Sequence, residues 1–589
     1  MTGKEVTQSQ WKKRKGGFRA SMFVFVLSSL DNMGSVANMV SLVLYFYGVM
    51  HFDLSSSANT LTSFMGSSYL LSLVGGFISD TYLNRLTTCL IFGFLEVLAL
   101  VVVTIQAASN NLHPDACGKS SCVEGGVAAM FYTSLCLLAL GTGGVRGCMT
   151  AFGADQFDEK DPVEAKALAS FFNWLLLSST VGAIVGVTGV VWVSTQRAWH
   201  WGFFIITVAS FVGFVTLALG KPFYRIKTPG DSPILRIVQV FVVAFKNRKL
   251  PLPDPHQQLY EISDKDDTVE KIAHTNQMRF LDKAAILQED STKSQPWKVC
   301  TVTQVEEVKI LTRMLPIFGS TIIMNTCLAQ LQTFSVQQGN VMNLKLGSFT
   351  VPAPSIPVIP LLFISILVPI YEFCFVPFAR KITRHPSGIT QLQRVGVGLA
   401  LSAISMAVAG VVEVKRRDQG RKDPLKPISL FWLSFQYALF GVADMFTLVG
   451  LLEFYYRESP SSMKSLSTSF TWLSTSLGYF LSTVFVNVIN AVTRIITPSK
   501  QGWLHGFDLN QNNLNLFYWF LAILSGLNFI NYLYWASWYK YKSEELNSKA
   551  LNKVESTQER DTENLRLMEA AKIGEGPSSS DETEGGTAK

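Results

Sequence analysis

The chain contains twelve long apolar runs, and this repetition limits the folds that are open to it. A run of about 20 apolar residues can cross a hydrocarbon core of about 30 Å as a helix. With 48% hydrophobic and 12% aromatic residues, the 589-residue chain is also too apolar for an ordinary soluble protein. We therefore expect an all-α membrane protein. The predicted spans lie near residues 20–48, 59–79, 87–108, 127–150, 169–193, 200–220, 308–334, 355–378, 394–413, 429–454, 466–491 and 515–538.

Charges near the first span indicate a cytosolic N-terminus. Five basic residues precede that span, and positive residues favour the cytosolic side. They are Lys12, Lys13, Arg14, Lys15 and Arg19. We expect the first span to be retained, because a second span follows at once and no small-residue cleavage site closes its apolar region. An even number of spans then places the C-terminus inside as well.

One loop conflicts with this topology. Six basic residues follow the ninth span, although the count of twelve spans places this loop outside. They are Lys415, Arg416, Arg417, Arg421, Lys422 and Lys426. We keep twelve spans because the first helices dominate the positive-inside rule and because the other loops obey it.

A polar segment between Phe223 and Val305 separates six spans from six more. It contains PLPDP (251–255) and the charge-rich stretch Glu261 to Lys271, and the residues from Arg279 to Leu287 predict a short surface helix. Six plus six spans indicate two bundles with a substrate path between them, as in the major facilitator fold. We expect a cytosolic N-terminal segment (1–19), an N-terminal six-helix bundle (20–222), a cytosolic central loop (223–306), a C-terminal six-helix bundle (307–540) and a disordered cytosolic tail (541–589).

Arg146 is a charge within the fourth predicted span, in the segment GTGGVRGCMTAFGADQFDE (141–159). Such a charge costs about 2.5 to 3.5 kcal/mol on insertion scales, so it is tolerated mainly where it faces water, a partner or a ligand. An arginine does not lose its proton in a protein, but its planar fork can hold a carboxylate or nitrate. The alternative is that the side chain extends to the cytosolic surface.

The first span carries a polar stripe. Ser28, Asp31, Ser35 and Asn38 recur at spacings of three, four and three, which places them on one face of a helix. We expect this face to line a substrate cavity, although interhelical hydrogen bonds would also explain the serines and the asparagine. Asp31 is a candidate proton-coupling residue, because a carboxyl group in a low-dielectric site can exchange a proton near neutral pH.

Other intramembrane polar residues occur in later spans. Asp444, in the tenth span, is a second candidate proton-coupling residue, with a static salt bridge to Arg146 or a lysine as the alternative. Asn325 and Gln332 in the seventh span are candidate cavity donors, or else they form ordinary interhelical hydrogen bonds. Two further polar groups, Glu96 and Gln330, are interpreted as pore or packing residues.

A gating motif is predicted at the cytosolic end of the second span. Gly76 is followed by Asp80 and, five residues later, by Arg85. The glycine allows a close helix approach, and the acid and the base can join neighbouring helices in one state of a transport cycle. Asp155 begins an acidic run after the fourth span, which is interpreted as a structural latch or a solvated loop.

The remaining motifs exclude several functions. Cys117 and Cys122 share a short polar loop that faces outside or a lumen, where a local disulfide and two free thiols are both open alternatives. The eight cysteines show no spacing typical of a metal cluster, and no phosphate-binding loop such as G-x-x-x-x-G-K-[ST] is present. Without a nucleophile and base or a cofactor fingerprint, we expect no enzyme, no cofactor, no metal and no nucleic-acid partner.

Several segments resemble one transporter family. They are Gly141 to Glu159, LPIF (315–318), AQLQTFSVQQG (329–339), RKITRHPSGITQLQRVG (380–396) and LEFYYRESPSSMKSLST (452–468). In order along residues 16 to 540, they resemble the plant branch of the proton-coupled oligopeptide and nitrate transporter family. The segments PIFGSTIIMNTCLAQLQTFSVQQG and VGLLEFYYRESPSSMKSLSTSF most resemble its fourth subfamily, which includes importers of abscisic acid and gibberellin as well as nitrate carriers.

The resemblance implies proton-coupled import of a small anion by alternating access, across the plasma membrane rather than the vacuolar membrane. The family usually has lysine at the place of Arg146 and commonly has an acid at that of Asp444. Its first span typically carries Glu-x-x-Glu-Arg, whereas this chain has Ser28, Ser29, Leu30, Asp31 and Asn32, so that only Asp31 can titrate. If Asp31 no longer works with a nearby base, Asp444 is the better proton site.

The seventh span bears on the substrate. In a plant nitrate carrier of this family a histidine contacts nitrate, and the corresponding residue here is Leu328. Nitrate binding by that route is excluded, and an apolar residue is more consistent with a larger, partly hydrophobic ligand. The expected partners are therefore a small anionic substrate, protons and the lipid bilayer, and the sequence carries no signal for an oligomeric state. A membrane sensor that has kept the fold and an uncoupled facilitator are the alternative functions.

Overall fold

A computed structural model describes residues 15–541, apart from 53, 116, 118–121, 159–160, 229–232, 252–258, 261–271, 273, 287–296, 347–348, 351–355, 384–387, 461–462, 497–501, 505–508 and 511. The chain forms two compact units, residues 1–536 and 537–589, of which the second is described only to residue 541. Some sequence predictions lie outside the described residues. They are the basic residues 12–14, the stretch 261–271, most of PLPDP, the end of the surface helix at Leu287, Glu159, and the tail from residue 542.

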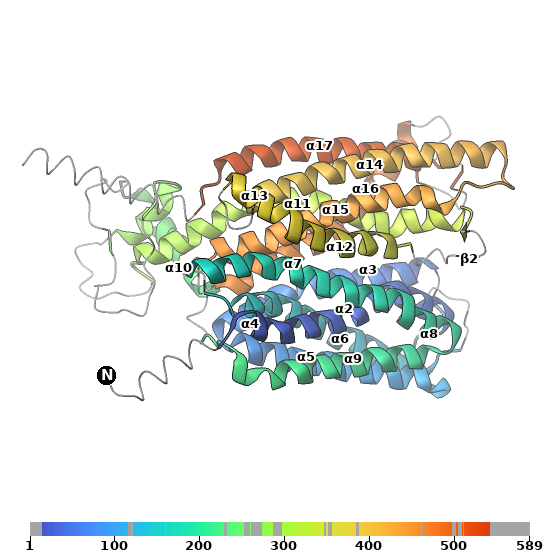
Figure 1. Cartoon of the computed structure of the whole chain (residues 1–589), viewed down its shortest axis with the longest axis horizontal. Helices are drawn as coiled ribbons and strands as arrows, with labels where there is room; N and C mark the ends of the chain where they lie inside the picture. Colours follow the sequence, from blue (N-terminus) through green and yellow to red (C-terminus); the bar gives the residue numbers. More distant parts are fainter. Residues whose placement is uncertain are drawn as a thin grey trace, which may run out of the picture. The chain divides into compact units, whose positions relative to one another are not determined.

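Helices build both halves of the chain (Figure 1). The first half comprises α2 (Gly17–Gly48), α3 (Leu54–Leu70), α4 (Ser72–Thr81), α5 (Arg85–Ala108), η1 (Asn110–Leu112), α6 (Gly125–Ala154), α7 (Pro162–Val185), the π-turn η2 (Gly186–Val190), α8 (Val191–Gln196), α9 (Trp199–Leu219) and η3 (Lys221–Phe223). The second half comprises α11 (Val302–Asn340), α12 (Val358–Ile370), the π-turn η7 (Tyr371–Phe375), α13 (Val376–Thr383), α14 (Gln391–Lys422), η8 (Leu430–Trp432), α15 (Leu433–Glu458), α16 (Lys464–Ile496) and α17 (Leu514–Trp538). Two short strands, β1 (Lys345–Leu346) and β2 (Phe349–Thr350), pair antiparallel.

Within the described residues, twelve helices are long and apolar enough to cross a membrane, six in each half. Four of these spans consist of consecutive segments, namely α3 with α4, α7 with α8, α12 with α13, and η8 with α15. The π-turns account for two of the breaks, since they keep the backbone helical while changing its register. The predicted all-α fold with twelve spans is confirmed.

Side chains at helix starts explain several boundaries. The Asn84 side chain accepts a hydrogen bond from the Thr87 amide at 2.8 Å and begins α5. Asp161 caps α7, whose first residue is a proline. Thr301 and Thr390 begin α11 and α14 with capping boxes, in which the cap side chain and the side chain three residues later satisfy each other's backbone amides.

Glycines bring α4 and α6 into backbone contact. A Cβ atom added at Gly75 would lie 2.3 Å from the Gly144 carbonyl oxygen, and one added at Gly147 would lie 2.1 Å from the Ser72 carbonyl oxygen. Small residues allow such close approach in membranes, where helix packing depends on van der Waals contact and interhelical hydrogen bonds. The two helices therefore pack with their backbones in direct contact.

The central loop contains α10 (Pro233–Lys246), η4 (Asn247–Lys249) and η5 (Arg279–Ala285). The predicted surface helix from Arg279 forms as the 3-10 segment η5, whereas α10 was not expected from the sequence. Lys309 of α11 is fully buried and its Nζ lies 2.6 Å from Asp282 and 2.8 Å from Glu306. These ion pairs attach η5 to the start of the second half.

The basic stretch after the ninth span is helical rather than a loop. α14 continues to Lys422, nine residues beyond the predicted end, so the expectation of a positively charged loop is corrected. Arg416 is buried against Glu413 at 2.7 Å, Arg417 donates to Asn515 at 2.8 Å, and the Lys415 Nζ lies 3.5 Å from the centre of the Trp432 ring. Because local partners compensate these charges, the stretch is a poor guide to topology.

Candidate functional site

A cavity of about 280 Å³ lies between the two halves. α2, α3, α6 and α7 line it from the first half, and α11, α12, α15 and α16 from the second. The structure brings seven of the predicted site residues to its wall. They are Ser28, Asp31, Arg146, Asn325, Leu328, Gln332 and Asp444. Most of the remaining lining is apolar or aromatic, so a few polar groups face one another across an otherwise hydrophobic chamber.

Arg146 reaches the cavity from the interior of α6, eight residues before its end. The guanidinium donates to the Ser68 Oγ at 3.1 Å, and its central carbon lies 5.0 Å from the centre of the Tyr69 ring. Within the described part of the chain it makes no ion pair. The side chain points into the molecule, which contradicts the alternative that it extends to the surface.

The other cavity residues differ in how strongly they are held. Asn325 donates to the Ser474 Oγ at 2.9 Å, and the Gln332 side-chain oxygen accepts a hydrogen bond from the Tyr479 hydroxyl. These contacts join α11 to α16, so both residues form interhelical hydrogen bonds and also face the cavity. Asp444 makes no ion pair among the residues described, which contradicts a static salt bridge to Arg146.

The polar stripe of α2 is divided between two cavities. Ser28 and Asp31 face the central cavity, whereas Ser35 and Asn38 line a separate cavity of about 20 Å³. The expectation that all four line one cavity is therefore wrong. A helix stripe follows a slow left-handed drift around the axis, so its ends meet different neighbours. Arg146 lines both cavities and thereby connects them.

Gln330 and Glu96, both interpreted from the sequence as pore or packing residues, have different surroundings in the structure. Gln330 is a packing residue, because its Nε2 donates to the Ser482 Oγ at 2.6 Å in a fully buried contact between α11 and α16. Glu96 is buried beside Asp31 and lines the smaller cavity. This neighbour of Asp31 was missed in the sequence, since only the packing of α5 against α6 and α9, and of α2 against α9, brings the two carboxyl groups together.

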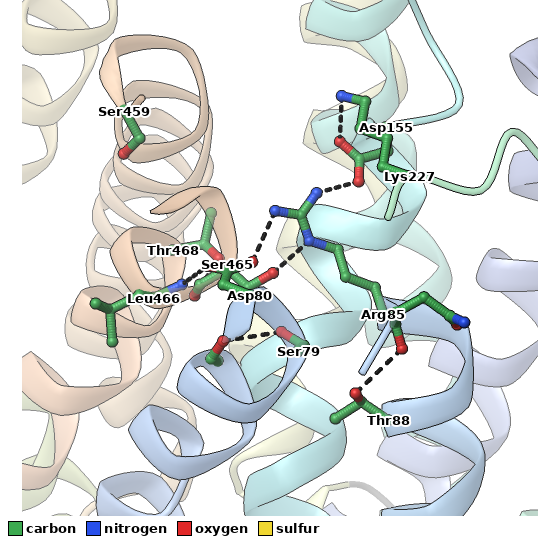
Figure 2. A network of polar contacts seen from close by, with 12 residues as sticks. Ser79, Asp80, Arg85, Thr88, Asp155, Lys227, Ser459, Ser465, Leu466 and Thr468 are labelled. Carbon is green, nitrogen blue, oxygen red and sulfur yellow. Dashed lines mark hydrogen bonds and ion pairs between the residues drawn. The ribbon is translucent and has the colours of Figure 1, made fainter. Parts of the chain in front are cut away.

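Arg85 lies at the centre of a buried ionic network (Figure 2). The network is at the end of the helices to which the central loop is attached. Arg85 pairs with Asp80 at 2.8 Å and with Asp155. The Lys227 Nζ lies 2.8 Å from Asp155, and the Tyr456 hydroxyl donates to Asp155 at 2.7 Å. With Ser465, whose hydroxyl accepts from the Arg85 Nε at 2.5 Å, these residues are called the Arg85 cluster.

The Arg85 cluster joins the two halves. Tyr456 and Ser465 belong to the second half, and the Leu466 amide donates to the Asp80 Oδ2 at 2.8 Å. Beside this contact, a Cβ atom added at Gly76 would lie 2.6 Å from the Ser469 Oγ. The close approach expected at Gly76 is thus present, and it brings α4 against α16 of the other half.

Asp155 is deprotonated in this network. Burial alone would raise the pKa of Asp155, but Arg85 and Lys227 lower it to about 2. Because the pKa lies below its ordinary value, the stabilisation is present above the ordinary pKa and is lost as the pH falls through about 2. The acid therefore remains charged at any physiological pH, and it is a buried ion-pair partner rather than part of a solvated loop.

A second polar contact joins the halves at the same end and was missed in the sequence. Glu372 of η7 accepts hydrogen bonds from Ser170 and, at 2.6 Å, from the Asn173 Nδ2. Arg394 of α14 donates to the Asn173 Oδ1 at 2.6 Å. Arg394 lies inside the segment 380–396 that carries part of the family resemblance, which was the only available signal.

Two further groups bear on metals and thiols. Cys117 and Cys122 are joined by a disulfide, with their Cα atoms 5.5 Å apart. His274, Asp282 and Glu306 offer ligand atoms that lie within 4.8 Å of one another. Lys309 pairs with both carboxylates, so its ammonium group already supplies the positive charge that a metal ion would bring.

Comparison with known proteins shows which family has this arrangement. The family model described as the POT family matches residues 86–504. The chain belongs to the POT family. Arabidopsis thaliana relatives include Protein NRT1/PTR FAMILY 4.6, 41% identical over 90% of this chain and 95% of its own length, and Protein NRT1/PTR FAMILY 4.5, 42% identical over 90% and 94%. The resemblance to the fourth plant subfamily is confirmed.

Solved POT structures share the fold. The transporter PepTSo has a TM-score of 0.61 at 18% identity, covering 88% of this chain and 98% of that one. An auto-inhibited POT family peptide transporter has a TM-score of 0.59 at 19% identity, covering 89% and 97%. Family and structural neighbours are transporters and not enzymes, so this POT family chain is a multi-pass membrane transporter with the major facilitator fold.

Proposed function

We propose that the chain imports a small anion together with protons, by alternating access to the central cavity. One observation carries this proposal, namely the permanent positive charge of Arg146, which faces a mostly apolar cavity and makes no ion pair with the residues described. A buried charge without a counter-ion is costly, so a site of this kind favours an anionic ligand. The guanidinium can bind a carboxylate through two parallel hydrogen bonds.

The rest of the cavity supports a ligand with an apolar body. Leu328, Phe440 and Ile364 contribute hydrophobic surface, while Asn325 and Gln332 offer polar atoms from α11. Small-molecule sites are typically lined in this way, and the volume of about 280 Å³ is near the lower end of their usual range. These features favour a carboxylate plant hormone such as abscisic acid or a gibberellin, with nitrate as a smaller anion that Arg146 could also hold.

Asp31 and Asp444 are the proposed proton-coupling residues. They face the same cavity from opposite halves, Asp31 from α2 and Asp444 from α15. A proton that binds at either acid changes the charge near the bound anion. This change in charge couples the movement of protons to the movement of the anion. The plasma membrane is the proposed location, and import toward the cytosol follows from a central loop on the cytosolic side.

Gating is assigned to the contacts between the halves. The Arg85 cluster and the Glu372 contact join the two halves, which supports the proposal that the exit at the end with the central loop is shut in this state. Release to that side requires these hydrogen bonds to break while others form at the opposite end. This is the ordinary requirement of a rocking transporter.

Uptake by oocytes tests the proposal. Wild-type chain and the variants Arg146→Ala and Asp444→Asn are supplied with abscisic acid, a gibberellin, nitrate or a dipeptide at external pH 5.5 and 7.5. We expect anion uptake to rise at pH 5.5, Arg146→Ala to abolish it more strongly than uptake of a neutral analogue, and Asp444→Asn to remove the pH dependence. Equal wild-type uptake at the two pH values would refute proton coupling, and unchanged anion uptake by Arg146→Ala would refute its role.

A sensor or an uncoupled facilitator is the second candidate. It is favoured by the first span, where Asn32 stands in place of the arginine usual in the family and donates to the Ser28 carbonyl at 3.0 Å instead of pairing with an acid. Reconstituted vesicles separate the cases. A sensor binds abscisic acid without net flux, whereas a facilitator shows flux that is independent of pH.

A further inference from the structure

Two buried carboxyl groups lie side by side in the first half. Asp31 of α2 and Glu96 of α5 are each 2% exposed and are within hydrogen-bonding reach of each other. The Asp31 Oδ1 and the Glu96 Oε2 are buried, and neither accepts a hydrogen bond from any described residue. Glu96 lines a cavity together with Gly34 and Ser35, which follow Asp31 by about one turn of α2, so the two unpartnered acceptors are close enough to share a proton.

Simple electrostatics favours a shared proton here. Two carboxylates in contact repel each other, so one of them holds a proton that both can use. An unpaired buried polar atom also costs free energy, and a proton between the two groups removes that cost.

Residues of α6, α7 and α9 surround the pair. Arg146 of α6 is the positive charge that acts on both acids. From α9, the Ser210 hydroxyl lies 3.4 Å from the Glu96 Oε1. Gly141 of α6 packs directly against Glu96, since an added Cβ atom would lie 2.6 Å from the Glu96 amide nitrogen. On the side of α7, Ser179 pairs with Ser28 at 2.6 Å and brings no charge.

Each acid faces a different compartment. Asp31 lines the central cavity, whereas Glu96 lines the cavity of about 20 Å³ that also contains Asn38. That volume is enough for one water molecule, which needs at least about 10 to 15 Å³ of probe-occupied space. The Asn38 Oδ1 is itself buried without a hydrogen-bond partner among the described residues, as expected for a group that contacts such a water.

A second small cavity extends the polar path. It has a volume of about 10 Å³, shares Asn38 with the first, and is lined by Tyr45 and Gln106. The Tyr45 hydroxyl and the Gln106 Nε2 are also buried without partners in the part of the chain that the structure describes. Gln106 lies two residues before the end of α5, so the path runs toward the end opposite the central loop.

We propose that Glu96 and Asp31 together form one proton-binding site, with Glu96 facing the polar path and Asp31 facing the substrate cavity. This inference rests on the proposed proton-coupled transport and adds Glu96 to it. With one shared proton the pair has a net charge of −1, which weakens the attraction of Arg146 for an anion from a distance, although no ion pair forms. A second proton, taken up through the path, neutralises the pair and strengthens that attraction, so that an anion binds. Loss of that proton restores the negative charge and releases the anion.

Transport by purified protein in liposomes tests the pair, with nitrate and abscisic acid as probes. The variants are Glu96→Gln, Asp31→Asn and the double variant. Glu164→Gln is the matched control, because Glu164 pairs with Arg225 at 2.6 Å outside the cavity. We expect each single variant to reduce the ratio of uptake at pH 5.5 to that at pH 7.5 to about one, and the double variant to reduce it no further, because the groups act as one site.

Two outcomes bear directly on Glu96. Exchange of labelled for unlabelled probe needs no proton gradient, so measurable exchange by Glu96→Gln shows that the variant is folded. A Glu96→Gln variant that exchanges and keeps the wild-type pH ratio overturns the inference, while the proposed function stands. If wild-type uptake has no pH dependence, the proposed function fails instead. Infrared difference spectra between the two pH values then test the pair alone: a protonated-carboxyl band lost in both single variants supports it, and a band unaffected by Glu96→Gln overturns it.

Discussion

The Asp155→Asn substitution is expected to weaken closure at the end that carries the central loop. Asp155 accepts hydrogen bonds or ion pairs from Arg85, Lys227 and Tyr456, and only the last of these crosses between the halves, at 2.7 Å. A hydrogen bond to a charged group contributes about 1.5 to 3 kcal/mol. Taking about 2 kcal/mol, the population of the closed state relative to the open state falls roughly 30-fold.

Pulsed electron paramagnetic resonance can measure this shift. Spin labels at Val163→Cys in α7 and Ile382→Cys in α13 occupy exposed positions in opposite halves. The exposed native thiols Cys136 and Cys374 are replaced by serine to avoid extra labels. We expect Asp155→Asn to increase the share of the longer distance between the labels.

A matched control and a pH series make the test strict. Glu164→Gln removes an ion pair with Arg225 of the central loop at the same end but no hydrogen bond to the second half, so the share of the closed-state distance should remain that of the wild type. The pKa of Asp155 is about 2, so the acid is charged at pH 5.5 and at pH 7.5. The difference between variant and wild type should therefore be equal at both pH values. Equal distance distributions in Asp155→Asn and wild type would refute the assigned role of the Arg85 cluster.

Three further results are expected. Gly76→Ala should lower transport and favour the open state in the same distance measurement, because its Cβ atom would meet α16 at 2.6 Å; wild-type transport would contradict the close approach. Glu413→Gln should lower thermal stability in detergent by about 3 to 5 kcal/mol, since it leaves Arg416 buried without its partner, and an unchanged melting temperature would exclude a structural role. Mild reduction of the Cys117–Cys122 disulfide should loosen only its own loop, so that proteolysis there increases while uptake persists; loss of uptake would show that the loop is coupled to transport.

Much of the candidate site could be predicted from the sequence because polar residues are rare in membrane helices. Asp31, Arg146 and Asp444 each stand out against apolar neighbours, and burial of a charge in lipid is costly enough to indicate a cavity. The structure places all three on one chamber. The spans themselves were predictable for the same reason, since their length and composition are set by the bilayer.

Pairings between distant helices could not be predicted. The role assigned to Glu96 depends on its neighbour Asp31, which lies 65 positions earlier in the sequence. The role of Glu372 depends in the same way on Asn173, which lies 199 positions earlier. A single helix shows which face is polar, but not which helix that face will meet. For the same reason, the expected single cavity along the stripe from Ser28 to Asn38 was wrong.

The end of α14 was also missed, for a different reason. A hydropathy pattern ends a span where charges begin, at Glu413, but a helix continues as long as its backbone amides find partners. Glu413 and Arg416 satisfy each other on successive turns, and the chain therefore extends the helix beyond the apolar core.

The attachment of the central loop sets a limit on how far the two halves can separate. On one side Arg225 is held by Glu164 at 2.6 Å, and on the other Arg236 of α10 is held by Glu307 at 3.1 Å. Lys227 also pairs with Asp155 of the first half at 2.8 Å, so only six residue steps separate it from the start of α10 at Pro233. Even fully extended they span about 21 Å. A loop of some 80 residues thus acts as a short tether, and inserting glycine and serine residues between positions 227 and 233 would lengthen the tether without altering either half.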